Sequence, residues 1–210
     1  MYGQEMREKA MMEHEKMWDR RLQIQTIGRD AVNADQYRYP YEPTPYCVLE
    51  RLANSGLIGE NDVVLDYGCG KGRADFFLSC QTKADTIGIE YDERIYRDAT
   101  DNQKLIPSRT KTSFVLTRAE VYDVPTDVNR CYFFNPFSVE ILRKVMARIM
   151  ESYYENPRKI LLFFYYPSEE YLSFLTTAEE LEYYDEIPCG DLFAGNDPRE
   201  RIVIFQLSCY

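Results

Sequence analysis

The spacing of hydrophobic and polar residues changes along the chain. From residue 4 to about residue 32 there is no proline, and isolated apolar residues recur among mixed charges. This pattern predicts one or two amphipathic helices. Three prolines between Pro40 and Pro45 then exclude a helix in that stretch. A short helix is predicted over residues 45–54, because Thr44-Pro45 suits a helix start and Gly56 a helix end.

Beyond residue 60, short apolar runs alternate with helical patterns. Strands are predicted at residues 63–67, 86–90, 113–117, 131–135, 160–166, 182–188 and 202–207. Helices are predicted at residues 72–80, 92–104, 139–155 and 168–176. Runs that are apolar throughout, such as "ILLFFYY", indicate strands buried on both faces. Together with the alternation, they predict a parallel sheet covered by helices.

The last two predicted strands are joined by "CGDLFAGNDPRER", which has no helical pattern. The final strand is therefore expected to run antiparallel, as part of a hairpin. The predicted fold is an α/β three-layer sandwich with a mostly parallel seven-stranded sheet and an antiparallel C-terminal hairpin strand. An N-terminal helical extension and cap segment, residues 1–43, precedes the Rossmann-like domain, residues 44–210.

Composition narrows the class of protein. The chain contains no apolar run long enough for a membrane span, and its N-terminus is charged throughout, so a cytoplasmic protein is expected. Six scattered cysteines form no C-x-x-C pair and His14 is the single histidine, so no metal site is predicted. A net charge of −10 makes a nucleic-acid partner improbable, since such proteins usually present a basic surface.

The chemistry is concentrated in "VVLDYGCGKGRADFFLS", which starts at Val63. Its glycines follow a predicted strand and precede a helix, where open parallel sheets bind ligands and glycine lets the backbone approach them. Glu90 ends the next strand, 18 residues after Gly72, and suits the two hydroxyls of a ribose. Asp66, two residues before Gly68, disfavours a pyrophosphate and suits a cationic amine. An adenosine-containing ligand that carries an amine is predicted.

These features together resemble the class I S-adenosylmethionine-dependent methyltransferases over roughly residues 44–208. The shared features are an acid-x-Gly-x-Gly-x-Gly loop, Glu90, a fourth strand that ends in Asn135-Pro136-Phe137, and a final hairpin. The resemblance implies a methyltransferase with S-adenosyl-L-methionine as its cofactor. Read without the resemblance, the glycines are a tight strand–helix turn.

The resemblance also implies roles for individual residues. Those that match the cofactor motifs are Asp66, Gly68, Cys69 and Gly70 at the methionine end, Glu90 at the ribose, and Tyr91 beside the adenine. After the third strand many relatives have Gly-Asp-Ala, but this chain has Arg118-Ala119-Glu120. Backbone groups near Ala119, or the Glu120 carboxylate, would then meet the adenine. For Tyr91, a packing role remains the alternative.

Asn135-Pro136-Phe137 matches the motif beside the transferred methyl group, and we expect the catalytic residues there. Methyltransferases of amino groups often have Asn or Asp, two prolines and an aromatic residue, and this chain lacks the second proline. Asn135 would orient an acceptor amine, and Phe137 would cover the substrate. The alternative is a turn that ends a strand, for which Asn-Pro is ordinary.

The segment "YRYPYEPTPY" is unusually aromatic for a linker. The resemblance implies a cap in which Glu42 and Thr44 meet the methionine part of the cofactor and Tyr39 and Tyr41 contact the substrate. Tyr166 joins them, because its strand points to the same edge of the sheet, as do Tyr165 and Phe193. The alternative is an extended linker whose aromatic rings pack on the sheet.

The expected function is methyl transfer from S-adenosyl-L-methionine to a nitrogen of a small molecule or protein. The alternatives are a non-catalytic protein that binds the same cofactor and a methyltransferase of nucleic-acid amines. The sequence leaves the acceptor and the oligomeric state open.

Overall fold

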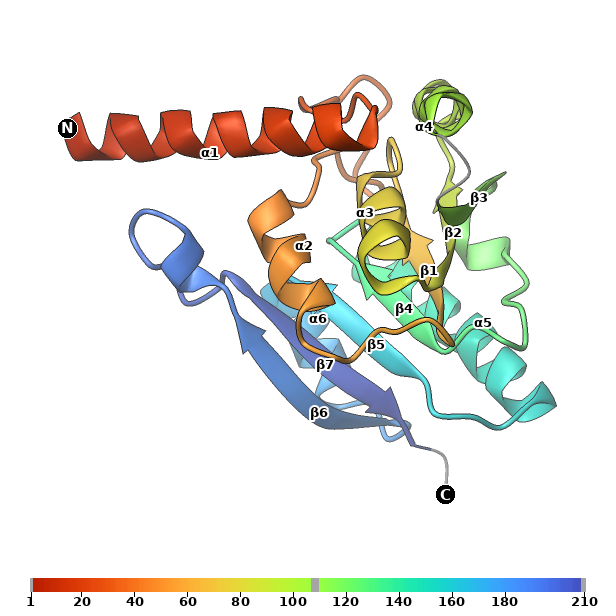
Figure 1. Cartoon of the computed structure of the whole chain (residues 1–210). Helices are drawn as coiled ribbons and strands as arrows, with labels where there is room; N and C mark the ends of the chain where they lie inside the picture. Colours follow the sequence, from red (N-terminus) through yellow and green to blue (C-terminus); the bar gives the residue numbers. More distant parts are fainter. Residues whose placement is uncertain (1, 107–109, 209–210) are drawn as a thin grey trace.

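A seven-stranded sheet forms the centre of the molecule in the computed structural model, which describes residues 2–106 and 110–208 (Figure 1). The strands are β1 (Val63–Tyr67), β2 (Asp85–Glu90), β3 (Lys111–Leu116), β4 (Arg130–Phe133), β5 (Leu161–Tyr165), β6 (Leu181–Pro188) and β7 (Arg201–Leu207). Their spatial order is β3-β2-β1-β4-β5-β7-β6. β1 to β5 pair in parallel, and β7 is antiparallel to both of its neighbours. The predicted sheet and its antiparallel hairpin are confirmed.

Helices cover both faces of the sheet. They are α1 (Tyr2–Leu22), α2 (Tyr46–Ala53), α3 (Arg73–Thr82), α4 (Glu93–Leu105), α5 (Val139–Glu155) and α6 (Glu169–Leu175), with short 3-10 helices at Ala119–Val121 and Gly190–Leu192. One hydrophobic cluster joins α1, α2 and α3 to one face of the sheet, and a second joins α5 and α6 to the other. α4 packs on β2 and β3. The result is the three-layer arrangement that the alternating pattern predicts.

The N-terminal extension is a single helix and is shorter than the helical pattern. α1 ends at Leu22, and Gln23 has a positive φ of 62°. The expectation of helix as far as residue 32 is therefore wrong. Ile24 is nonetheless buried, and the Asn102 side chain bonds to both the N–H and the carbonyl of Gln25. The apolar residues after Leu22 thus belong to an irregular segment that packs on the domain.

The second half of α1 packs against the domain. Trp18 packs on Phe77, with ring centres 4.9 Å apart, and on Tyr46 at 5.9 Å. The buried Arg73 guanidinium pairs with Glu15 and lies 3.8 Å from Asp19. The first half of the helix extends past the body of the molecule (Figure 1). These contacts connect α1 to the start of α3, directly after the glycine loop.

The order of strands creates a switch point between β1 and β4. The chain moves outward from β1 to β2 and β3 on one side and from β4 to β5 on the other. In open sheets of this type, ligands bind at the carboxyl ends of the strands beside such a point. The loops after β1, β2, β3 and β4 all arrive there.

Candidate functional site

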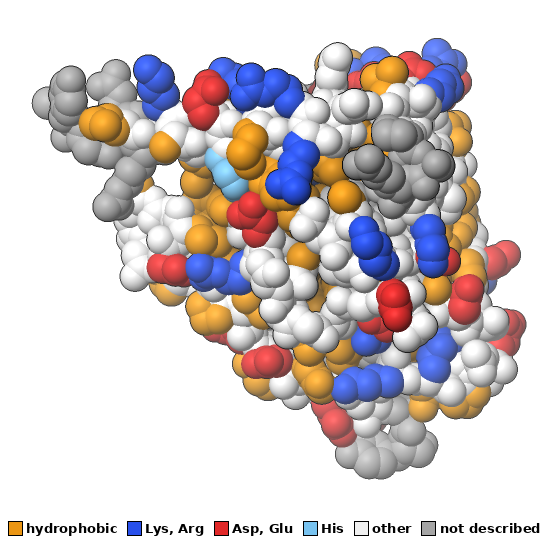
Figure 2. All heavy atoms as spheres, viewed as in Figure 1, with side chains coloured by type: hydrophobic (Ala, Val, Ile, Leu, Met, Phe, Trp, Pro, Cys, Tyr) orange, Lys and Arg blue, Asp and Glu red, His pale blue; other side chains and the backbone are white. Residues whose placement is uncertain are grey.

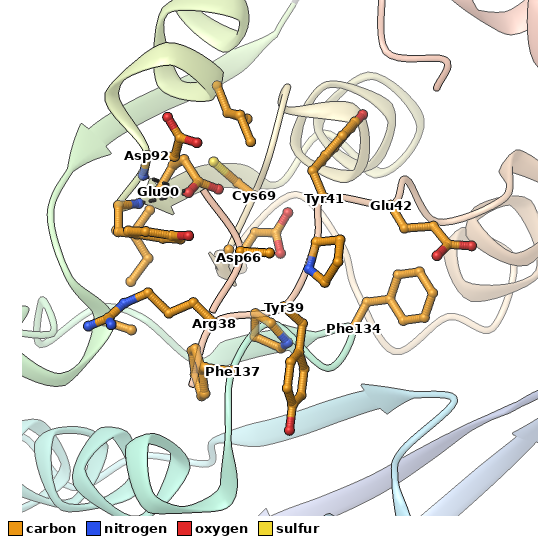
Figure 3. A pocket seen from close by; sticks show the side chains of 18 of the residues that line it. Arg38, Tyr39, Tyr41, Glu42, Asp66, Cys69, Glu90, Asp92, Phe134 and Phe137 are labelled. Atoms are coloured by element: carbon orange, nitrogen blue, oxygen red, sulfur yellow. Dashed lines mark hydrogen bonds between the residues drawn. The ribbon is translucent and has the colours of Figure 1, made fainter. Parts of the chain in front are cut away.

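A hollow lies at this carboxyl edge, with about 940 Å³ of empty space including its open mouth. Its walls are the loops after β1 to β4 and the segment of residues 23–43, called the cap segment below. In Figure 3, Asp66 lies near the centre, with Glu90 and Asp92 on one side and Tyr41 and Glu42 on the other. The hollow thus joins parts of the chain that are far apart in sequence.

Glycines of the first loop make close approach possible. Gly70 has a φ of +58°, and a Cβ atom there would lie 2.2 Å from the ring of Tyr41. A Cβ atom on Gly68 would lie 2.5 Å from the Cβ of Pro136. Any larger residue would clash at both positions. The loop therefore has glycine where the cap segment and the loop after β4 cross it.

Glu90 ends β2 and is held in one orientation. Its Oε2 accepts a hydrogen bond from the Gly70 N–H (3.1 Å), and its Oε1 accepts from the N–H groups of Tyr91 (2.8 Å) and Asp92 (2.9 Å). Burial raises the pKa of this carboxyl, while the three backbone bonds oppose the shift. The side chain connects the glycine loop to the start of α4 and lines the hollow.

Asp66 and Asp75 form a buried carboxyl pair. Neither carboxyl oxygen of Asp75 has a hydrogen-bond partner, and the Asp66 carboxyl is close enough that its charge raises the pKa of Asp75 further, after burial. Two neighbouring buried carboxyl groups resist being charged together, so one of them is expected to carry a proton. No lysine or arginine in the described chain forms an ion pair with either group. Burial is the main reason that the pKa of Asp66 is raised to about 7. The Asp66 side chain lines the hollow.

The cap segment crosses the mouth of the hollow and is anchored on its far side. The Tyr39 N–H donates to the Pro136 carbonyl (3.2 Å), and the Ser138 N–H donates to the Tyr37 carbonyl (2.8 Å). Arg38 Nη2 donates to Glu120 at 3.0 Å, and its guanidinium lies 5.1 Å from the centre of the Tyr91 ring. The cap segment therefore connects the loop after β4 with Tyr91 and Glu120, the residues that the sequence predicts to lie near the adenine.

The base of the same segment is held by buried polar contacts. The Tyr41 hydroxyl donates to the Thr26 carbonyl at 2.6 Å. Thr44 shares a hydrogen bond of 2.9 Å with the Tyr132 hydroxyl, and the Thr44 carbonyl accepts from Arg73 at 3.2 Å. Tyr41 and Thr44 are thus packed into the structure and also line the hollow.

Most of the residues singled out in the sequence line this one hollow. They are Tyr39, Tyr41, Glu42, Thr44, Asp66, Gly68, Cys69, Glu90, Tyr91, Ala119, Glu120, Pro136 and Phe137. Others do not line it, and of these Tyr165 and Phe193 line a second hollow. Gly70 lies beneath the Tyr41 ring, while Asn135 and Tyr166 also line the second hollow. The structure thus shows that these residues lie together. The role of each one stays a prediction.

The second hollow lies beyond a wall that both share, formed by Phe134 and the 39–43 part of the cap segment. Asn135 has a φ of 40°, and both ends of its amide are engaged. Its Nδ2 donates to the Tyr166 carbonyl at 2.6 Å, and its Oδ1 accepts from the Ser168 N–H at 3.2 Å. Asn135 therefore fixes the loop between β5 and α6, one wall of the second hollow.

Sequence reasoning missed Arg38, Asp75 and Glu200. Arg38 lies inside the tyrosine-rich segment, and no motif in the sequence marks it as a binding residue. Asp75 is in the first turn of α3, where an acid is common for the helix dipole, so nothing in the sequence marks it as paired. Glu200 lies in the hairpin loop, and only the folded loop places it at the second hollow.

We predict that amide exchange in the cap segment slows when S-adenosylhomocysteine binds. The segment is anchored at separate points, and a ligand in the hollow would add contacts between them. Mass spectrometry with and without the ligand measures this, with residues 147–155 of α5, which do not line the hollow, as an internal control that should not change. Equal protection in both states would mean that the segment is a fixed part of the scaffold.

No family model and no curated protein matches the chain. Solved structures do match it. A putative methyltransferase, yhhF, from Escherichia coli has a TM-score of 0.59 at 17% identity and covers 87% of this chain and 100% of its own. A TehB-like SAM-dependent methyltransferase from Corynebacterium glutamicum has a TM-score of 0.56 at 18% identity, covering 96% and 99%. The chain has the class I methyltransferase fold.

Other structures with this fold act on different acceptors. An RNA methyltransferase from Salinibacter ruber, in complex with S-adenosyl-L-homocysteine, has a TM-score of 0.55 at 16% identity, covering 80% of this chain and 95% of its own. Mitomycin 7-O-methyltransferase MmcR has a TM-score of 0.57 at 14% identity, covering 78% and 55%. The class I methyltransferase fold is thus shared, and the acceptor has to be argued from the site.

Other features of the described residues bear on partners. No group of His, Cys, Asp and Glu side chains among them is arranged to hold a metal ion. None of the helices in the described chain is long and apolar enough to cross a membrane. On the face shown in Figure 2, basic and acidic side chains are intermingled. That face does not present the broad basic surface on which nucleic-acid binding usually depends.

Proposed function

We propose that the protein is an S-adenosylmethionine-dependent methyltransferase that acts on a nitrogen of a small molecule or protein. The observation that carries the proposal is Asp66, a buried carboxyl without a cationic partner that faces a hollow between the glycine loop and Glu90. Such a group suits an ammonium ligand, because an opposite charge would offset its burial. The free thiols of Cys47, Cys69, Cys80, Cys131 and Cys189 support the expected cytoplasmic location.

The residues around the hollow fit the parts of this cofactor. Asp66 would hold the ammonium group, and Thr44 lies on the same side beneath the cap segment. Glu90 would accept the ribose hydroxyls with the lone pairs that its backbone bonds leave free. Tyr91 and the turn at Ala119 would enclose the adenine. When bound, the cofactor supplies a sulfonium methyl: nitrogen's lone pair forms the new bond, the carbon–sulfur pair stays on sulfur, and nitrogen releases a proton.

The chain's own contribution to transfer is to orient the acceptor and to exclude water. Phe137 is buried beside the hollow, and Pro136 packs against Gly68. Asn135 fixes the loop after β5 through its amide, as described above. We therefore keep Asn135-Pro136-Phe137 as the proposed catalytic segment, with residues 1–43 as an extension and cap over the 44–210 domain.

Asn135→Ala is expected to lower kcat/KM by roughly a hundredfold, comparable to removing one preorganised polar group. Affinity for S-adenosylhomocysteine should stay within about 0.5 kcal/mol, because the side chain does not line the first hollow. Turnover and calorimetry measure the two effects, with Asn156→Ala at the end of α5 as the matched control. Loss of cofactor binding in a folded Asn135→Ala protein would make Asn135 a cofactor ligand; no change in either would make it only a turn.

Turnover with a labelled methyl group tests the proposal against its alternatives. We expect label to pass from S-adenosylmethionine to an amine in a panel of metabolites and peptides. Cofactor binding without transfer to any of them would favour the non-catalytic alternative. Transfer to single-stranded nucleic acid, with an affinity that falls steeply with salt, would favour the nucleic-acid alternative.

A further inference from the structure

The second hollow has a lining of a distinct chemical kind. It contains about 1140 Å³ of empty space including its mouth, and it adjoins the first hollow across Phe134 and Tyr39. Aromatic residues supply much of its wall, namely Tyr39, Phe134, Tyr165, Tyr166 and Phe193. The rings of Phe134 and Tyr165 have centres 4.7 Å apart. Aromatic faces attract cations as well as apolar groups.

The charged groups of the wall are mostly acidic. Glu42 and Glu200 line the hollow, and Arg29 is the only basic residue among its described lining. The Arg29 guanidinium lies 3.7 Å from the Glu42 carboxylate, so these two charges offset each other. Glu200 is different, because it forms no ion pair with any described residue. The hollow is therefore left with one carboxylate that lacks a cation.

Glu200 is also held in position. The Tyr165 hydroxyl donates to its Oε2 at 2.5 Å, and its backbone carbonyl accepts from the Cys189 N–H at 2.7 Å. The nearby Asp197 is engaged with Arg199, so neither leaves a free charge at Glu200. Partial burial raises the pKa of the Glu200 carboxyl, and the bond from Tyr165 opposes this. A carboxylate fixed in this way is suited to a cationic ligand group.

We infer that the second hollow binds the acceptor as a cationic amine, with the cation between the Glu200 carboxylate and the aromatic wall. The ammonium passes one proton to this carboxylate, and the nitrogen lone pair that this frees then forms the bond to the methyl group. The inference rests on the proposed function, since it names the substrate class of that site. A neutral hydroxyl acceptor would leave the Glu200 charge uncompensated. The position next to the first hollow places such an amine beside Asn135 and Phe134, on the side where the proposed catalytic segment begins.

Choline and its neutral carbon isostere, 3,3-dimethylbutan-1-ol, provide a direct test. They have the same shape and differ in charge, and choline's quaternary nitrogen cannot accept a methyl group. Ligand-observed NMR titration is carried out with S-adenosylhomocysteine present, and binding of S-adenosylhomocysteine is measured separately. We expect choline to bind about fivefold or more tightly than the isostere, the scale of a cation–aromatic contact together with a partly exposed ion pair.

Variants distinguish binding of choline at the second hollow from nonspecific attraction to an acidic protein. Glu200→Gln should lower the preference for choline to the part that the aromatic rings alone provide, while Glu151→Gln on the exposed side of α5 should leave it unchanged. Tyr165→Phe keeps the ring but loses the bond to Glu200, and it should weaken choline binding about threefold. Thermal unfolding checks that each variant is folded.

The outcomes distinguish the two proposals. Equal affinity for choline and its isostere, or a preference that is undiminished in Glu200→Gln, would overturn the inference even if S-adenosylhomocysteine binds. Absence of S-adenosylhomocysteine binding would overturn the proposed function, while a charge preference that depends on Glu200 would still support the cation site.

Discussion

Glu90→Ala is expected to weaken the binding of S-adenosylhomocysteine by about 1.5–3 kcal/mol, the scale of a hydrogen-bonding partner that carries charge. This corresponds to roughly a 10- to 150-fold rise in Kd. The carboxylate is the one acidic group at the end of β2 that also bonds to the glycine loop. Its removal therefore takes away both a ligand for the ribose and the bond that holds Gly70.

The variant needs a control for stability, because alanine leaves the N–H groups of Gly70, Tyr91 and Asp92 without their acceptor. Glu90→Gln keeps one acceptor oxygen and should fold more readily, with weakened binding in the same direction. Glu93→Ala removes an exposed carboxylate three residues further along, and it should bind S-adenosylhomocysteine as the unmodified protein does. Unchanged affinity in folded Glu90→Ala would exclude Glu90 from the site.

The affinity for S-adenosylhomocysteine is expected to rise with pH through about 7. Burial raises the pKa of Asp66 to about 7, and the cofactor's ammonium requires its charged form. The ammonium and carboxylate of the ligand keep their charges across this range, so the change belongs to the protein. Each pH unit below 7 should cost about tenfold in affinity, or about 30-fold between pH 8 and pH 5.5.

Two variants assign this pH dependence. Asp66→Asn should bind weakly and with little dependence on pH. Asp75→Asn keeps a donor for Asp66 without a second ionisable group, so binding at pH 8 should be retained. Calorimetry from pH 5.5 to pH 8 measures the profile. A flat profile in the unmodified protein would mean that Asp66 does not carry the ammonium.

The sheet was predictable because its signal is local. Runs such as that of β5 are apolar throughout, and α5 was predicted with the bounds that it has, Val139–Glu155. The helix predicted beyond Leu22 was wrong because the structure of that stretch depends on a distant contact. Ile24 and Ile27 continue a helical spacing, but Asn102, 77 residues away, binds the backbone of Gln25 and holds that stretch as an irregular segment. A contact of that separation leaves no trace in the local pattern.

The site divides in a similar way. The shared position of Asp66 and Glu90 at one hollow could be predicted, because both lie at the carboxyl ends of neighbouring parallel strands; their roles stay predictions. The pairing of Asp66 with Asp75 depends on how α3 packs, and the separation of Asn135 from the first hollow depends on where the cap segment crosses. Glu200 comes from a hairpin loop whose sequence has no periodicity. These relations come from tertiary packing, which the sequence pattern does not encode.

Calorimetric titration of the unmodified protein tests whether the first hollow binds S-adenosylmethionine. We expect saturable one-to-one binding of S-adenosylhomocysteine at pH 8 and no binding of NAD under the same conditions. Tight binding of NAD, with no response to S-adenosylhomocysteine, would contradict this expectation.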